Sequence, residues 1–318
     1  STPLYSSAAS DVYKRQKLES IVMSSFEQRI TSYIEDIDHY LLSKLPINES
    51  PPANLHKAMH YSVMNGGKRI RPLLTFASAE SLEIDPKILM PAAASIELLH
   101  CFSLVHDDLP CMDDDDLRRG RPSTHKEFGE ATAVLAADAL LSLSFEILAS
   151  DLSFGATATN NASLIALISS ATGSKGITGG QQLDLNAEEK IISQSELEHI
   201  YRQKTGKLLR ACVLAPTCFI NISLEQMSAL EVYIDLIGLA FQIRDDILEA
   251  EGSTEIIGKS SKSDIHQGKA TFPKIFGLDE SKKRILELLA LAQNQISVFG
   301  ERARPLQYMA ESIINREF

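Results

Sequence analysis

The sequence predicts an all-α protein, a single-domain bundle of long, mostly antiparallel helices around a central apolar cavity. Three observations predict this fold. Apolar residues recur at helical spacing through most segments. Strand signals are scarce, because no alternating run of Val, Ile and Thr is bounded by hairpin turns. No linker rich in Pro, Gly and Ser divides the 318 residues into halves.

The first predicted helix begins at Phe26 and continues through Leu41, with apolar residues three or four positions apart. Pro46, Pro51 and Pro52 then indicate a loop. The segment 132–152 is rich in Ala and Leu with few charges, so we expect a buried central helix there. The same periodicity predicts helices over 92–106, 164–173, 197–214, 224–247 and 281–299.

Residues 1–22 are rich in Ser and Ala and lack the apolar segment of a secretory signal. Met23 is followed by an amphipathic run and has the character of a natural start. We therefore expect 1–22 to be a non-native or disordered leader, and 23–318 to form the functional domain.

The composition argues against several classes of protein. The net charge is −11 and no basic stripe stands out, so we expect no nucleic-acid partner. No stretch approaches about 18 uninterrupted apolar residues, so we expect no stable membrane insertion. The cysteines have neither CxxC nor zinc-like spacing, which favours reduced thiols in a cytoplasmic protein; they are Cys101, Cys111, Cys212 and Cys218.

The first acidic segment, 107–116, holds six aspartates in ten residues and follows an apolar helix. Carboxylate oxygens suit Mg²⁺, and Arg118 and Arg119 directly after them supply charge for a phosphate. A solvated acidic loop capped by arginines is the alternative. On an ideal helix Asp107 and Asp113 lie about 240° apart, so they converge only if the helix breaks between them. Pro110 supplies a reason for such a break.

The second acidic segment holds Asp245, Asp246 and Glu249. Asp245 and Glu249 are about 40° apart around a helix, so both can face one cavity. The preceding run, 236–243, is mainly apolar, and buried carboxylates are costly without partners, which favours metal binding. An ordinary helix end with surface acids is the alternative.

Basic and glycine-rich segments complete the set. Gly66 and Gly67 precede Lys68, Arg69 and Arg71, an arrangement that can approach a phosphate or simply begin a basic helix. It lacks the Walker frame. Looser candidates, each of which alone can be solvated, lie at 204–207, Lys259 and 268–273. The glycine and glutamine run 179–184 either lines a cavity or breaks a helix.

In order, the segments GGKRIRP, HDDLPCMDDDDLRRGRPSTH, GGQQLDL, KTGKL, FQIRDDILE and GKATFP resemble the trans-isoprenyl diphosphate synthases (polyprenyl synthetases). The resemblance covers about residue 26 to the last residue and is strongest to the bacterial farnesyl diphosphate synthases. It implies the isoprenoid synthase fold and a Mg²⁺-dependent trans-prenyltransferase. That reaction condenses isopentenyl diphosphate with dimethylallyl and then geranyl diphosphate. A cytoplasmic homodimer is also implied.

The resemblance assigns roles to particular residues. About three Mg²⁺ ions, for which Mn²⁺ can substitute, would bridge the allylic diphosphate to Asp107, Asp108, Asp113, Asp245 and Asp246. Glu249 is a weaker ligand candidate, because the family usually has aspartate there. Arg118, Lys204 and Lys259 would stabilise the departing pyrophosphate. Isopentenyl diphosphate would be held by Lys68, Arg71, His100 and Arg119. Thr205 and Gln242 would line the allylic site.

Product length follows from the residues before the first motif. Phe102 lies five residues before Asp107, so its ring can form a floor under the growing chain, with Ser103 beside it. An aromatic residue there and the two-residue insertion in the motif resemble the family's C15-forming members, which favours farnesyl diphosphate. The alternative is the C20 product, geranylgeranyl diphosphate, if the ring tilts aside.

Three other classes of protein fit the sequence less well. A terpene cyclase would lack the isopentenyl site, so Lys68, Arg71 and His100 argue against it. A non-catalytic partner subunit should have lost an aspartate or a phosphate-binding cation, and nearly all are present. A calcium-binding structural protein would need an EF-hand loop pattern, which the acidic run lacks.

Overall fold

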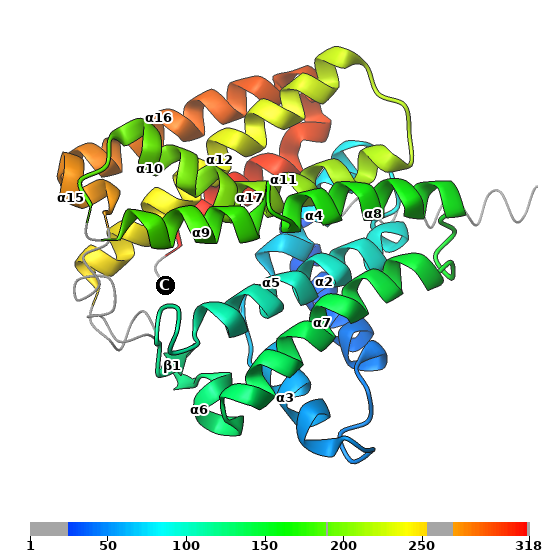
Figure 1. Ribbon diagram of the computed structural model, residues 1–318. Coiled ribbons are helices and arrows are strands. Elements are labelled where there is room, and N and C mark those ends of the chain that lie inside the picture. The colour runs from blue at the N-terminus through cyan, green and yellow to red at the C-terminus, as the bar shows by residue number, and fades with distance from the viewer. Residues whose placement is uncertain (1–24, 189, 253–269, 317–318) are drawn as a thin grey trace, which may run out of the picture.

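The computed structural model describes residues 25–188, 190–252 and 270–316, and it confirms the all-α prediction. Residues 1–22 and Lys259 lie outside the described residues, so the leader and the role of Lys259 stay predictions. The helices pack side by side as a bundle (Figure 1). They are α2 (Phe26–Lys44), α3 (Ala53–Val63), α4 (Ile70–Ser81), η1 (Pro86–Leu89), α5 (Met90–Asp107), α6 (Thr124–Phe128), α7 (Glu130–Ser150), α8 (Ala158–Thr172), α9 (Ile177–Ala187), α10 (Gln194–Tyr201), η2 (Arg202–Gly206), α11 (Lys207–Leu214), η3 (Ala215–Cys218), α12 (Leu224–Glu251), α15 (Phe272–Phe276), α16 (Leu278–Gln295), η4 (Ile296–Ala303) and α17 (Arg304–Ile314).

Several helix starts are fixed by local sequence. In a capping box the first side chain accepts from the third helical N–H, and the third side chain accepts from the capping residue's N–H. Ser25, Thr157, Ser193 and Ser223 make this reciprocal pair at the starts of α2, α8, α10 and α12. These caps satisfy N–H groups that a helix terminus otherwise leaves without partners.

The predicted helices are found, with two corrections. The segment 132–152 is helical as α7, but the prediction that it is a buried central helix is wrong. One face packs on α5, whereas Val134 and Leu135 on the other face are exposed. The segment 197–214 is not one regular helix, because a π-helical turn, η2, separates α10 from α11. The run 179–184 lies inside α9, so the alternative of a helix break there is also wrong.

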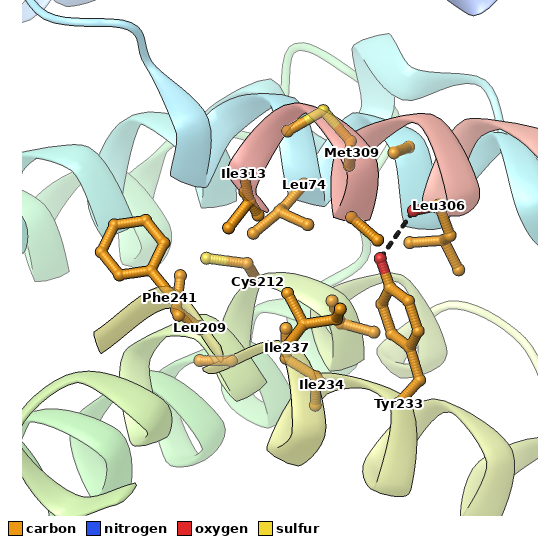
Figure 2. Close-up of a cluster of buried hydrophobic side chains, with 14 of the residues drawn as sticks. Leu74, Leu209, Cys212, Tyr233, Ile234, Ile237, Phe241, Leu306, Met309 and Ile313 are labelled. Carbon is orange, nitrogen blue, oxygen red and sulfur yellow. Dashed lines mark hydrogen bonds between the residues drawn. The ribbon is translucent and has the colours of Figure 1, made fainter. Parts of the chain in front are cut away.

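The largest hydrophobic cluster joins α4 and α17 to α11 and α12 (Figure 2). Leu74, Cys212, Ile237 and Met309 meet there from these four helices. The buried Tyr233 hydroxyl donates a hydrogen bond to the Leu306 carbonyl at 2.7 Å, so α12 and α17 are tied by a polar bond within the core. This packing fixes α12, the helix that carries the second acidic segment.

Phe102 occupies a junction in the core. Two further clusters lie beside the largest one: the first joins α2, α3, α5 and α7, and the second joins the end of α5 to the start of α7. Phe102 is partly buried and packs against all three clusters. Phe102 therefore lies where the three clusters meet, on the helix that leads into the first acidic segment.

Two helical stretches are long and apolar enough to cross a membrane by length and composition alone, Pro86–Asp107 and Glu130–Ser150. Of the apolar window, 78% is buried in the first and 39% in the second. The first has the burial of a core helix, and core helices commonly pass this test. In α7 the window is apolar, but more than half of it is not buried in the described chain.

Candidate active site

The first acidic segment folds back on itself where α5 ends. Asp107 is the last residue of that helix, and the Asp113 N–H donates to the Asp107 carbonyl at 2.9 Å. The Asp114 N–H donates to the Leu109 carbonyl at 3.1 Å, and Asp114 has a positive φ of 51°. The predicted break between Asp107 and Asp113 is therefore confirmed, and the loop returns Asp113 to the helix end.

The acids of this segment divide into buried and exposed groups. Asp108, Asp113 and Asp115 are only 2%, 8% and 3% exposed, whereas Asp114 and Asp116 are exposed. The alternative of a solvated acidic loop is therefore wrong for the first three. Because an isolated buried carboxylate is costly, each of them requires a compensating charge or donor.

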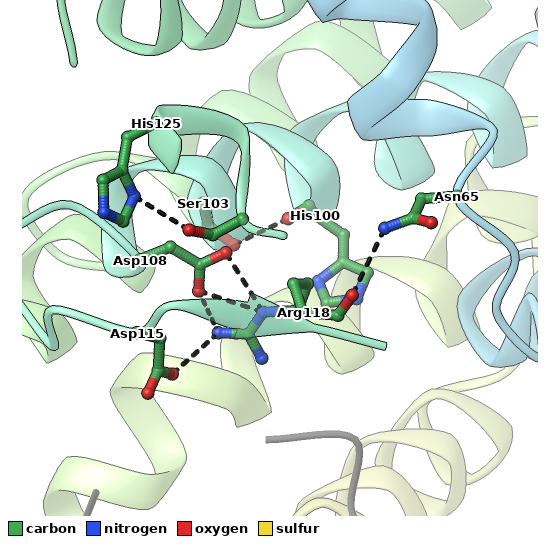
Figure 3. A network of polar contacts seen from close by, with 8 residues as sticks. Asn65, His100, Ser103, Asp108, Asp115, Arg118 and His125 are labelled. Atoms are coloured by element: carbon green, nitrogen blue, oxygen red, sulfur yellow. Dashed lines mark hydrogen bonds and ion pairs between the residues drawn. The ribbon is translucent and has the colours of Figure 1, made fainter. Parts of the chain in front are cut away.

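Arg118 supplies part of that compensation from a short hairpin that the sequence did not predict. The strands β1 (Leu117–Arg118) and β2 (Arg121–Pro122) are joined by Arg119 and Gly120, which both have positive φ, as a type I′ turn requires. The hairpin directs the Arg118 guanidinium onto Asp108, with an Nε–Oδ1 distance of 3.0 Å, and onto Asp115 at 3.3 Å (Figure 3). Although burial lowers the pKa of Arg118, the Asp108 carboxylate outweighs it and the pKa is raised.

The glycine pair before Lys68 positions the next arginine. The Arg119 guanidinium donates to the Gly66 carbonyl, and a Cβ on Gly67 would lie 2.7 Å from Arg119 Cζ. Gly67 therefore leaves the space that the Arg119 side chain occupies. Arg69, by contrast, is buried and pairs with Glu97 at 2.9 Å and with Asp38 at 2.7 Å, so this member of the basic segment has a structural role.

Arg71 and Arg119 bring positive charge close to the neutral ring of His100. Burial lowers the pKa of Arg71, and its guanidinium makes no ion pair with the residues that the structure describes. Burial also lowers the pKa of His100 well below its ordinary value, and the neighbouring Arg71 and Arg119 lower it further. Cations crowded together in this way are stabilised when an anion binds between them. Lys68, on the same segment, is exposed.

Lys204 lies on the opposite side of the first motif. Burial alone lowers its pKa, but the carboxylates of Asp184, Asp107 and Asp113 outweigh burial and the pKa is raised. The Nζ atom lies 2.6 Å from Asp184 Oδ2 on α9. The π-helical turn η2 carries Lys204 together with the buried Thr205, and such turns are frequent at functional sites.

Gly180 permits the close approach of α9 to this turn. A Cβ at Gly180 would lie 2.2 Å from the Lys204 backbone nitrogen. The run 179–184 therefore contributes both the space for Lys204 and, through Asp184, its partner.

The second acidic segment lies on the regular helix α12, as predicted. Asp245 and Glu249 are one turn apart and partly exposed, and Gln242 precedes them on the same helix. Asp246 is buried: its Oδ2 accepts from the Tyr201 hydroxyl at 2.5 Å and from the Phe272 N–H at 2.7 Å. The alternative of an ordinary helix end with surface acids does not fit Asp246. Its role as a metal ligand stays a prediction.

The residues predicted to set product length lie on α5. The Phe102 ring packs edge-on against the His106 ring, with centroids 4.8 Å apart. The Ser103 hydroxyl donates to the His100 carbonyl at 2.9 Å (Figure 3), so it is engaged with its own helix.

Sequence reasoning missed three residues that contact the predicted site. Asp184 pairs with Lys204, Tyr201 donates to Asp246, and Arg316 pairs with Asp245. Asp184 was only part of a segment of uncertain use. Nothing in the sequence pattern marks Arg316, because it lies 71 residues from its partner.

The donor set fits Mg²⁺, which is usually held by one or two carboxylates together with substrate phosphates. Asp107 and Asp113 are brought together by a backbone bond, and both act on the charge of Lys204. Within the described residues no three Asp, Glu, His or Cys side chains form a ready-made metal cluster.

Comparison with known proteins assigns the family. The sequence model of the protein family described as polyprenyl synthetase matches residues 52–301 of this chain. The chain belongs to the polyprenyl synthetase family. A farnesyl diphosphate synthase of Bacillus subtilis (strain 168) is 42% identical over 260 residues, which is 81% of this chain and 88% of that protein. Geranylgeranyl pyrophosphate synthase 7 of Arabidopsis thaliana, a chloroplastic protein, is 37% identical over 95% of this chain and 91% of its own.

Solved structures agree with the family assignment. A geranyltransferase from Helicobacter pylori, complexed with magnesium and isoprenyl diphosphate, superimposes with a TM-score of 0.80 at 30% identity and covers 92% of this chain and 97% of that one. The polyprenyl synthetase described here thus has the all-α isoprenoid synthase fold and is a trans-prenyltransferase, as the six ordered segments predicted.

Proposed function

We propose that this polyprenyl synthetase condenses isopentenyl diphosphate with dimethylallyl and then geranyl diphosphate and releases farnesyl diphosphate. The observation that carries the proposal is the partly buried guanidinium of Arg71, crowded by Arg119 and His100 and without an ion-pair partner in the described chain. A terpene cyclase has one diphosphate to bind, at the metal. The guanidinium groups of Arg71 and Arg119 are proposed to bind a second anion beside the acidic segments, which supports a reaction between two diphosphates.

The two acidic segments are proposed to hold Mg²⁺, with Asp107, Asp113 and Asp245 as the best-placed ligands. Bound Mg²⁺, in a number of about three ions, would neutralise the allylic diphosphate and favour its departure. The Helicobacter pylori structure, which contains magnesium and an isoprenyl diphosphate, supports this assignment. Asp108 is paired with Arg118, and Asp246 with Tyr201, so we propose that these two act mainly by fixing the shape of the site.

The protein's own groups would then divide the work. Arg118 and Lys204 face the departing pyrophosphate, and their raised pKa values keep both charged. Lys68, Arg71, His100 and Arg119 hold the isopentenyl diphosphate. The side-chain oxygens of Thr205 and Gln242 are proposed to stabilise the allylic cation until the isopentenyl double bond attacks it. The proton lost in that step goes to the released pyrophosphate.

The test is a product assay with Mg²⁺, isopentenyl diphosphate and each allylic diphosphate in turn. We expect farnesyl diphosphate from both dimethylallyl and geranyl diphosphate, and no product after chelation of the metal. If no allylic diphosphate gives a product, the proposed condensation activity is refuted, and the alternative of a non-catalytic partner subunit is favoured. Mn²⁺ in place of Mg²⁺ should restore activity to the chelated protein.

Product length is the part of the proposal with a serious alternative. The similarity to the Arabidopsis geranylgeranyl pyrophosphate synthase favours C20, whereas the position of Phe102 between three hydrophobic clusters favours C15. We expect Phe102→Ala to lengthen the product and Phe102→Tyr, which keeps the ring, to leave it at C15. Mainly C20 product from the wild type, or an unchanged C15 product from Phe102→Ala, would contradict the proposal that the Phe102 ring limits the length of the product.

We also propose a homodimer in the cytoplasm. The exposed apolar face of α7 supports it, since Val134 and Leu135 are 37% and 57% exposed on a helix of high mean hydropathy. The four cysteines are all free thiols, as expected in a reducing compartment. Sedimentation of the wild type should give the mass of a dimer, and Leu135→Lys should shift it toward the monomer.

A further inference from the structure

We propose that Arg316 is a positioning residue for the second acidic segment: it fixes the carboxylate of Asp245 in the orientation from which that carboxylate binds a divalent cation. The inference rests on the proposed function, which makes Asp245 a metal ligand. It concerns a residue beyond α17 that belongs to none of the six segments recognised in the sequence.

Arg316 is held against one turn of α12 by several contacts. Its Nη2 atom forms an ion pair with Asp245 Oδ1 and donates to the Phe241 carbonyl at 3.2 Å. Its guanidinium carbon lies 3.9 Å from the centroid of the Phe241 ring, in cation–π contact. The Arg244 guanidinium donates to the Arg316 carbonyl at 3.0 and 2.6 Å. The Arg316 side chain is consequently only 10% exposed.

The contact with Arg316 restricts the orientation of the Asp245 side chain. The backbone of α12 fixes its Cα, but the side chain is 43% exposed, and a half-exposed aspartate on a helix can adopt more than one rotamer. A guanidinium that is itself fixed by stacking and hydrogen bonds selects one of them. A carboxylate has about four acceptor positions, so Oδ1 can accept from Arg316 while the group also binds a metal.

The sign of the effect separates two roles. A group that orients a metal ligand raises the affinity for the metal, and its loss typically costs about 10–100-fold. A counter-cation that the metal must displace lowers the affinity, so its loss would tighten binding. The contacts to Phe241 and Arg244 do not involve Asp245, and they hold Arg316 in place when the metal binds. We therefore expect orientation.

The experiment measures metal binding directly, by electron paramagnetic resonance titration of free Mn²⁺ in the presence of inorganic pyrophosphate. We expect Arg316→Gln to weaken Mn²⁺ binding by about tenfold or more. Arg316→Lys, which keeps the charge but loses the planar fork, should weaken it several-fold. The matched control is Arg302→Gln, because Arg302 pairs with Glu83 in an exposed bridge on η4. This variant should bind Mn²⁺ as the wild type does.

A double variant shows whether Arg316 acts through Asp245. In the Asp245→Asn background, Arg316→Gln should weaken Mn²⁺ binding no further, because the group that it orients is gone. A further loss there would mean a general structural role and overturn the inference. Should Arg316→Gln not fold, judged by thermal unfolding, Arg316→Lys carries the same comparison.

The outcomes are separable. If the wild type fails to bind Mn²⁺ with pyrophosphate, the proposed metal site is refuted, and the role of Arg316 with it. If the wild type binds Mn²⁺ and the Arg316 variants bind equally or more tightly, only the positioning role is refuted.

Discussion

The two acidic segments reach the same site by different construction. The first lies where α5 ends, and a loop with internal backbone bonds returns Asp113 to Asp107. The second lies on the uninterrupted helix α12 and takes its contacts from remote parts of the chain, Tyr201 and Arg316. A site built from a chain break has its geometry fixed within the motif, whereas a site on a straight helix needs partners from elsewhere.

The difference extends to charge. In the first segment Arg118, ten residues from Asp108, neutralises the acids locally. In the second, Asp245 pairs with Arg316, which is 71 residues away. Substitutions at Asp245 should therefore depend on a residue far away in the sequence, Arg316.

The largest expected effect tests the first segment. Asp107→Asn should lower kcat by about 10²–10³-fold, because the developing pyrophosphate charge loses a metal-binding carboxylate. Asp116→Asn is the matched control in the same acidic run, since Asp116 is exposed and pairs only at the surface with Lys126 at 2.7 Å. Steady-state kinetics at saturating Mg²⁺ measures both. Near wild-type rates for Asp107→Asn would remove the first segment from the metal site.

A smaller pair of effects tests the second segment. Asp245→Asn should lower the apparent affinity for Mg²⁺ by about 10–100-fold. Glu249→Gln should lower it by less than about tenfold, because its longer side chain favours contact through water. The measurement is activity as a function of Mg²⁺ concentration. A larger loss from Glu249→Gln would reverse the ranking and make the last acid of this segment a direct ligand.

Gly180 tests the link between α9 and the first segment. Gly180→Ala should lower kcat by about tenfold, because the new Cβ displaces the Lys204 backbone and small misplacements of catalytic groups are costly. It should also lower the free energy of unfolding by about 1–3 kcal/mol. Gly206→Ala serves as the control. Gly206 lies in the same π-helical turn as Lys204, and a Cβ there would meet no atom nearer than 3.7 Å. Equal kinetics for the two variants would contradict the proposed contact.

The smallest effect concerns His100, on the helix that leads into the first segment. Its pKa is lowered in the folded protein, so between the ordinary value of about 6.5 and the lower folded value only the unfolded chain takes up the proton. Stability should therefore fall as the pH drops from 7 toward 5, by at most about 1.4 kcal/mol per pH unit from this group. The free energy of unfolding, measured by urea unfolding at each pH in this range, should change less steeply with pH for His100→Gln than for the wild type. Identical slopes would contradict the burial of a neutral ring.

Much of this architecture could be predicted from sequence because its causes are local. Helical periodicity located the helices, and Pro110 with the angle between Asp107 and Asp113 located the break in α5. The hairpin at 117–122 was missed, because two-residue strands leave no alternating pattern. The π-helical turn was missed as well, since nothing in the residues Arg202–Gly206 distinguishes a π turn from an α turn.

The partners of the second segment could not be predicted for a different reason. Tyr201 and Arg316 reach Asp246 and Asp245 only through the packing of α10 and α17 on α12. Nothing near either residue distinguishes it from many similar side chains. The exposed face of α7 was likewise misjudged, because a run of Ala and Leu has the same composition whether it is covered by its own chain or by a partner.

The π-helical turn η2 has a consequence for which insertions and deletions the sequence can tolerate in evolution. A π turn accommodates one more residue than an α turn, so it shifts the phase of everything after it by about 100° relative to a continuous helix. With this shift both helices bury a face in the same hydrophobic cluster, Leu197 and Ile200 from α10 and Leu208, Leu209 and Cys212 from α11. Deletion of a single residue within 202–206 would rotate α10 relative to α11, so one of the two helices would lose its packing contacts with the neighbouring helices. Length at this point should therefore be under stronger constraint than the identity of most side chains.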